Sequence, residues 1–130
     1  MLPSVWPGDT LVIERVTADQ VRVGDVMLVG RDGRLCAHRV VSVAESCGGP
    51  RWITQGDANS APDRPVSEEE LLGRVDYVIR AGKLVPVPAE LSVVDRLIAK
   101  IVRRSETAAR ALVYLHRVVE TPKESPPCQG

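Results

Sequence analysis

The sequence predicts a mainly β fold, with an antiparallel β core followed by a C-terminal amphipathic helix. Up to about residue 88, short runs of β-branched residues alternate with Gly, Asp and Pro, which is the pattern of strands joined by tight turns. Beyond that point apolar residues recur every three to four positions, as in a helix. We therefore divide the 130 residues into a β domain over 1–88, a basic amphipathic helix over 89–120 and a disordered tail over 121–130.

Three strands are expected in the first half of the β domain. Residues 10–14 form a β-branched run that follows the turn formers Pro-Gly-Asp, and residues 26–29 form a second apolar run after another Gly-Asp pair. Asp32 and Gly33 are typical of a two-residue hairpin turn, because both residues tolerate positive φ. The third and longest strand should then cover residues 35–43.

The second half should add a short strand over 52–55, which ends in a Gly-Asp turn. Residues 58–65 are polar and rich in turn formers, so we expect an ordered surface loop. Residues 67–70 have the Ser-x-x-Glu pattern of a capping box at a helix start. The strands 75–79 and 84–87 should close the domain as a hairpin.

The C-terminal helix has two alternative environments. Its apolar stripe begins with Val94, Leu97, Ile98, Ile101 and Val102. Arginines and lysines occupy the opposite face, and the helix can break near Ser105. Such a helix either packs on the β domain or lies on an anionic membrane surface. We favour packing, because Ala108 and Ala109 provide little bulk for membrane insertion. No run of 18 apolar residues is present, so no transmembrane helix is expected.

Composition excludes several classes of function. The formal net charge is zero, which argues against a protein that binds nucleic acid through a strong positive field. The three cysteines have no regular spacing, so they indicate neither a disulfide framework nor a zinc site. Cys36 and His38 lie in one expected strand, but no second pair of metal ligands matches them. We expect neither a metal nor an organic cofactor.

The clearest candidate for chemistry is His38, in the middle of the longest expected strand. A serine nucleophile needs an adjacent base, and a carboxylate behind the histidine fixes its tautomer. Asp57 and Asp63 are the candidate carboxylates, although both can instead cap turns through their side chains. The other histidine, His116, is expected at the surface of the helix.

Five short blocks follow one another in a characteristic order over residues 1–80. They are Met1-Leu2-Pro3 with Pro7-Gly8-Asp9, Val23-Gly24-Asp25-Val26, Ala37-His38-Arg39-Val40-Val41, Gly56-Asp57-Ala58-Asn59 with Asp63, and Gly73-Arg74-Val75. In this order they resemble the type I signal peptidase family, in its Ser-His form. Each block is short, and the resemblance depends on their number and order.

The resemblance implies a serine endopeptidase that cleaves exported or membrane-tethered proteins. Its substrate would be an extended peptide with small residues before the cut, and no cofactor would be needed. His38 would be the general base and Asp63 would orient it, while Asp57 would support the site or share that role.

The nucleophile implied by the resemblance is absent from the chain as given. In the family it immediately precedes the methionine that corresponds to Met1. Ser4 is displaced from that position, and Ser42 should share the face of His38 but lie too far along the strand. We therefore expect the given chain to be inactive.

Two explanations fit this absence. In the first, which we favour, the natural chain begins upstream, adds the serine and is membrane-associated. In the second, the domain has lost catalysis and binds peptides or a protein partner; a chain without the upstream part would be soluble. A relationship to self-cleaving repressor domains is disfavoured, because no lysine lies near His38 and no DNA-binding segment is present.

Overall fold

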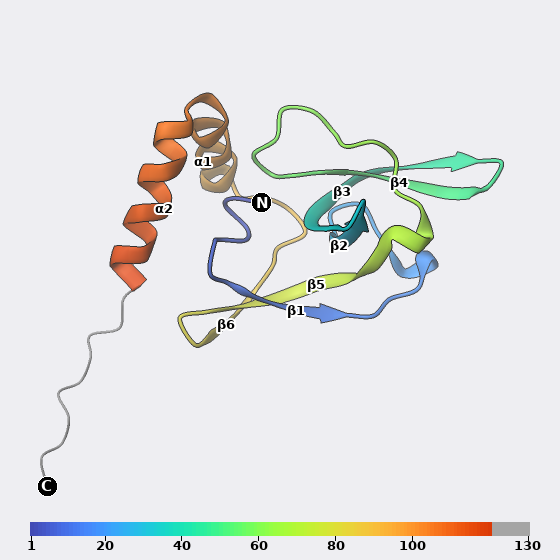
Figure 1. Cartoon of the computed structure of the whole chain (residues 1–130), viewed down its shortest axis with the longest axis horizontal. Coiled ribbons are helices and arrows are strands. Elements are labelled where there is room, and N and C mark those ends of the chain that lie inside the picture. The colour runs from blue at the N-terminus through green and yellow to red at the C-terminus, as the bar shows by residue number, and fades with distance from the viewer. Residues whose placement is uncertain (121–130) are drawn as a thin grey trace, which may run out of the picture.

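A computed structural model of the chain describes residues 1–120, so the expected tail lies outside the described residues. The elements are β1 (Thr10–Glu14), β2 (Val26–Arg31), β3 (Arg34–Ser46), β4 (Gly49–Gln55), β5 (Leu71–Arg80), β6 (Lys83–Pro86), α1 (Val93–Arg104) and α2 (Glu106–Glu120), with one-turn 3₁₀ helices at Ala18–Gln20 and Glu68–Glu70. The predicted mainly β fold with a helical C-terminal part is therefore confirmed (Figure 1).

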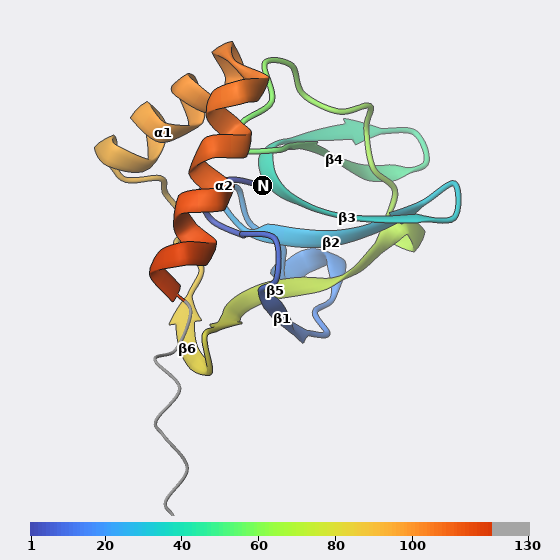
Figure 2. The ribbon, with the colours of Figure 1, turned by 60° about the vertical axis from the view of Figure 1, so that its left-hand side comes forward.

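The six strands form one curled antiparallel sheet in the order β1-β5-β2-β3-β4, with β6 paired to β5. The first half of β3 pairs with β2 and its second half pairs with β4. Because β3 changes partner along its length, it bends sharply, as Figure 2 shows. The bend brings β4 and the loop after it back over the sheet.

The core is mostly aliphatic, with one buried Trp, and lies on both faces of β2. Met27 and Val29 belong to one buried cluster together with Trp52, whereas Val26 belongs to a second with Val78. Successive residues of a strand point to opposite faces, so the curled sheet encloses β2 from both sides. Trp52 and Met27 are the largest fully buried side chains, and valines make up most of the remaining core.

A β-bulge interrupts β3 just after the bend. The pairing passes from Val40 opposite Thr54 to Ser42 opposite Ile53, which leaves Val41 as the extra residue. The extra residue inverts the alternation of faces. Ser42 therefore lies on the face opposite to that of His38, and the expectation that they share a face was wrong.

The C-terminal region forms two helices that are separated at Ser105, the residue near which the helix expected over 89–120 was allowed to break. Ser105 has extended backbone angles between α1 and α2, and its hydroxyl accepts a hydrogen bond from the N–H of Ala108. Ser92 caps α1 in the same way, by accepting from the N–H of Asp95. Neither helix of the described chain is long and apolar enough to cross a membrane.

The side chain of His116 joins α2 to the N-terminal segment. Its ring stacks on that of Trp6, with the ring centroids 4.0 Å apart and an interplanar angle of 18°. His116 is half-buried, so the expectation of a purely surface histidine was wrong. The periodicity of α2 could not reveal this contact, since it depends on a residue more than a hundred positions earlier.

Candidate active site

His38 on β3 is bound to Asp63, in the loop that follows β4. The Nδ1 atom of His38 lies 2.5 Å from Oδ2 of Asp63. Thr54 fixes this carboxylate from the neighbouring strand: its hydroxyl donates to the same oxygen at 2.9 Å, and its carbonyl accepts from the N–H of Asp63 at 2.7 Å. Asp63 is thus held by both its backbone and its side chain.

The contact determines which nitrogen of His38 can act as a base. An ionised carboxylate only accepts hydrogen bonds, so Nδ1 carries the proton and Nε2 keeps its lone pair. The side chains of His38 and Asp63 are 21% and 28% exposed, so the pair is neither sealed in the core nor fully solvated. The arrangement can accept a proton at Nε2 from a group that approaches it.

A hollow of about 260 Å³ opens beside this pair. Its lining combines apolar side chains with the charged groups of the loop: Val29, Arg31, Cys36, His38, Thr54, Asp63, Arg64 and Val66. Cys36 and His38 are two residues apart on β3 and therefore share a face of the strand. The hollow is large enough for a small side chain.

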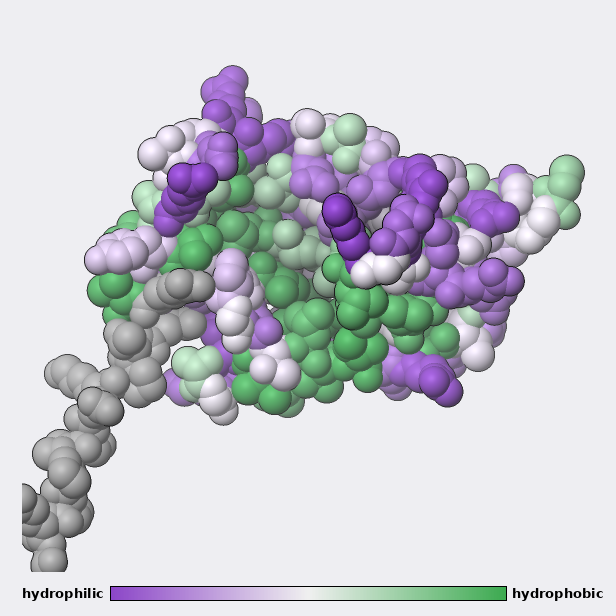
Figure 3. Space-filling model, viewed as in Figure 1, coloured by the Kyte–Doolittle hydropathy of each residue, from purple (hydrophilic) through white to green (hydrophobic). Residues whose placement is uncertain are grey.

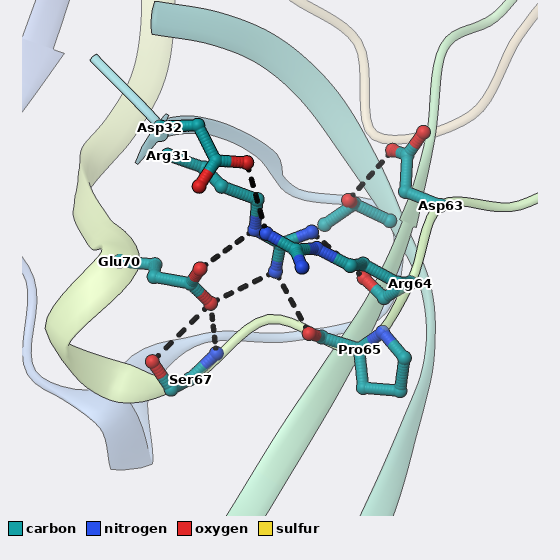
Figure 4. Close-up of polar contacts among 8 residues, drawn as sticks. Arg31, Asp32, Asp63, Arg64, Pro65, Ser67 and Glu70 are labelled. Carbon is teal, nitrogen blue, oxygen red and sulfur yellow. Dashed lines mark hydrogen bonds and ion pairs between the residues drawn. The ribbon is translucent and has the colours of Figure 1, made fainter. Parts of the chain in front are cut away.

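Arg31 and Glu70 hold the part of the loop that follows Asp63, over residues 64–67 (Figure 4). Arg31 donates from Nε and Nη2 to the two carboxylate oxygens of Glu70, at 2.6 and 2.8 Å, and to the carbonyl of Pro65 at 2.8 Å. Bonds from Arg31 and from the N–H of Ser67 lower the pKa of Glu70 to about 2. The Ser-x-x-Glu pattern identified the Ser67–Glu70 contact, but no local signal identified Arg31.

Asp57 lies in a different cluster, with Arg39. The Nε of Arg39 donates to one oxygen of Asp57 at 2.8 Å, and Nη2 donates to the other at 3.2 Å. The hydroxyl of Ser4 donates to that second oxygen at 2.5 Å. The side chains of Arg39 and Asp57 are only 9% and 2% exposed, so this is a buried ion pair.

Arg39 also binds three backbone carbonyls from distant segments. Nη1 donates to the carbonyls of Gly24, Pro88 and Ala89 at 2.8, 2.6 and 3.0 Å. A buried guanidinium requires partners for its donors, and here five different residues provide them. The sequence analysis did not predict this role. The signal was available, because an arginine next to Val40 and Val41 in an apolar strand indicates a buried charge that needs partners.

The N-terminal end lies beside the bend of β3 in both ribbon views (Figures 1 and 2). The side chain of Met1 packs against the cluster of Val26, Val75 and Val78. The nitrogen of Met1 is also close enough to Asp57 to interact with its charge. The start of the described chain is therefore next to the Arg39–Asp57 cluster and close to the strand that carries His38.

Of the three candidate site residues, the structure brings His38 and Asp63 together and places Asp57 on Arg39. Ser4 is brought to Asp57 and Arg39 and not to His38. Within residues 1–120, no group of three or more His, Cys, Asp or Glu side chains has an arrangement that could hold a metal ion.

Comparison with known proteins found a distant similarity. No family model and no solved structure matches the chain. It is 29% identical over 99 residues to the signal peptidase complex catalytic subunit SEC11C of Homo sapiens, and equally to those of Mus musculus and Canis lupus familiaris. The match covers 72% of this chain, and the chain spans about half (52%) of the length of these relatives. The similarity supports a type I signal-peptidase-like origin for the domain.

Proposed function

We propose that the chain is the catalytic domain of a serine endopeptidase of the signal peptidase type. His38 is its general base, Asp63 orients the histidine, and the nucleophile is a serine that immediately precedes Met1 in the natural protein. The observation that carries the proposal is the 2.5 Å contact between His38 and Asp63 at the edge of an open hollow.

The proposed reaction is acyl transfer in two steps. Nε2 of His38 takes the proton of the serine hydroxyl as the oxygen attacks the scissile carbonyl, and then gives it to the leaving amine. Water then attacks the acyl group and loses a proton to Nε2, which passes this proton to the departing serine oxygen as the acyl group is released. Throughout, Asp63 keeps Nδ1 protonated and stabilises the imidazolium.

Asp57 has a positioning role in this proposal. Its carboxylate binds Ser4 and Arg39, and so connects the N-terminal segment to β3. A serine placed directly before Met1 would extend from this anchored segment, beside the bend of the strand that carries His38. Asp57 therefore fixes where the nucleophile enters the site, and Asp63 is the carboxylate that contacts the base.

The proposed substrate is an extended segment of an exported or membrane-tethered protein, with small residues before the cut. The hollow of about 260 Å³ has room for a substrate side chain, and the preference for small residues is what the resemblance to the family implies. The name of the SEC11C relatives, a catalytic subunit of a signal peptidase complex, agrees with such substrates. The reaction needs no metal or organic cofactor, and the chain extended upstream would act at a membrane.

The second candidate function is a peptide- or protein-binding module that no longer catalyses hydrolysis. Within the described chain, the hydroxyl of Ser4 is committed to Asp57, and Ser42 lies on the other face of the strand from His38. These positions favour a binding role if no serine precedes Met1 in the natural protein.

The first test is to identify the N-terminal peptide of the native protein by mass spectrometry of membrane and cytosolic fractions. A peptide that continues upstream through a serine before Met1 supports the peptidase. A native chain that starts at Met1 excludes the proposed nucleophile and leaves the binding module.

A second test compares two versions of the chain, each with a short upstream extension that ends in either serine or alanine. We expect the serine version to cleave an unstructured peptide that contains a run of alanines, and the alanine version to leave it intact. Replacing His38 by Ala in the serine version should abolish cleavage. Equal activity of the serine and alanine versions would refute the mechanism.

A further inference from the structure

The apolar stripe of α1 is wider than the face by which the helix packs. Ile98, Ala99 and Val102 are turned inward, and Ala99 is only 3% exposed. Four other apolar side chains are largely exposed: Val93 at 83%, Val94 at 64%, Leu97 at 58% and Ile101 at 50%. At 3.6 residues per turn these four share one side of the helix. Half of the stripe therefore has no partner in the described chain.

Lys100 and Arg104 lie along this exposed apolar side, and Arg96 and Arg103 lie further round the helix. Arg96, Lys100, Arg103 and Arg104 are all exposed, and none forms an ion pair with another residue of the described chain. The single acidic residue of α1, Asp95, accepts the hydroxyl of Ser92 at the N-terminal cap. α1 thus combines an unpartnered apolar side with four uncompensated positive charges.

We propose that α1 binds the surface of an anionic lipid bilayer, with its axis in the plane of the membrane. Val93, Leu97 and Ile101 would enter the boundary between headgroups and acyl chains, while the neighbouring basic side chains reach the lipid phosphates. Charge complementarity favours an anionic bilayer over an apolar groove of another protein as the partner of α1. Each basic side chain near an anionic leaflet adds to the attraction between the helix and the membrane. The proposal is independent of the nucleophile and of the peptidase reaction.

The position of α1 allows this contact. The helix packs against α2 and extends outward from the sheet in Figure 2. A bilayer could therefore approach α1 without displacing the core strands.

A second apolar area covers the face that carries β1 and β5 (Figure 3). Tyr77 and Ile79 on β5 and Leu84 on β6 are also exposed, Leu84 at 60%.

The test measures flotation of the full chain with vesicles of phosphatidylcholine alone or with about one-third phosphatidylglycerol. We expect binding to the anionic vesicles only, weakened by high salt. Leu97→Glu should reduce the bound fraction by about tenfold or more. Leu84→Glu is the matched control, because the two leucines are almost equally exposed, and it should bind like the unchanged chain.

Charge is tested separately with Arg104→Ser, because Arg104 is exposed on the same side of α1 as Leu97, and Arg34→Ser on the β2–β3 hairpin is its control. Only the first should weaken binding to anionic vesicles. Circular dichroism and the melting temperature will establish that each variant is folded.

Three results would overturn the proposal. They are a lack of binding to anionic vesicles at low salt, binding that Leu97→Glu leaves unchanged, and equal losses for Leu97→Glu and Leu84→Glu. Light scattering without lipid tests the alternative occupant. If the unchanged chain forms a dimer that Leu97→Glu dissociates, this side of α1 is an interface between two copies of the chain.

Discussion

His38 and Arg39 are adjacent in β3, yet their side chains bind different carboxylates on opposite faces of the strand. His38 contacts Asp63 beside an open hollow, whereas Arg39 contacts Asp57 inside the protein. Alternation along the strand separates the two pairs. One pair borders open space, and the other is a buried ion pair that connects β3 to distant segments.

Asp57→Ala should destabilise the protein strongly. It leaves the guanidinium of Arg39 buried without its counter-charge, which typically costs about 3 to 5 kcal/mol. Urea denaturation of the variant measures the loss in the free energy of unfolding. Glu106→Ala is the control: the Arg110–Glu106 pair on α2 is 80% and 85% exposed, so its loss should cost less than about 1 kcal/mol. Equal effects of the two substitutions would contradict a stabilising role for Asp57.

Asp63→Asn should change the tautomer of His38 and leave the fold intact. The new side-chain amide can donate a hydrogen bond, so it favours the imidazole with the proton on Nε2. Nitrogen NMR of the His38 ring at a pH where it is neutral measures the change, with Asp57→Asn as control. In the serine-extended chain, activity should fall by about a thousandfold or more. An unchanged tautomer would contradict the orienting role of Asp63.

The contact between Arg31 and Glu70 should make the free energy of unfolding depend on pH in the acid range. The pKa of Glu70 is lowered from 4.5 to about 2 in the folded chain. A lowered folded-state pKa stabilises the protein above the unfolded-state value and ceases to do so as pH falls through the folded-state value. The difference in melting temperature between the unchanged chain and Glu70→Gln should therefore shrink between pH 4.5 and about 2. A difference that is constant over this range would contradict the assignment.

Trp6→Ala should loosen α2 from the N-terminal segment. Stacked aromatic pairs contribute about 1 kcal/mol beyond the area that they bury, and the Trp6–His116 contact is such a pair. Hydrogen exchange should accelerate in α2 and remain unchanged in β2 and β3. Tyr114→Ala is the control, because Tyr114 is 69% exposed. Unchanged exchange in α2 would show that other contacts suffice to hold the helix.

Local patterns predicted most of the strands and the turn at Asp32 and Gly33. These features depend on neighbouring residues, which a sequence displays directly. Asp63 could be proposed as a partner of His38 because the order of the short blocks matched a family pattern. The bulge at Val41 was invisible, since no change in composition marks an extra residue within a strand.

The roles of Arg39 and Arg31 could not be predicted from local patterns. Their partners lie 15 to 50 positions away for Arg39, and 39 positions away for the Arg31–Glu70 pair. Such contacts exist only after the sheet has curled. The same limit applied to α1, where periodicity revealed an apolar stripe but not which part of it would be covered.

The hydrogen bonds from the Arg39 side chain to backbone carbonyls affect where the chain can be shortened for expression. The carbonyls of Pro88 and Ala89 lie between the last strand and the cap of α1, and both accept from its guanidinium. A fragment that ends at residue 88 would lose the second of these acceptors and place a mobile carboxylate beside the Arg39–Asp57 pair. Fragments intended for crystallisation or NMR should therefore end beyond the start of α1, even when only the sheet is of interest.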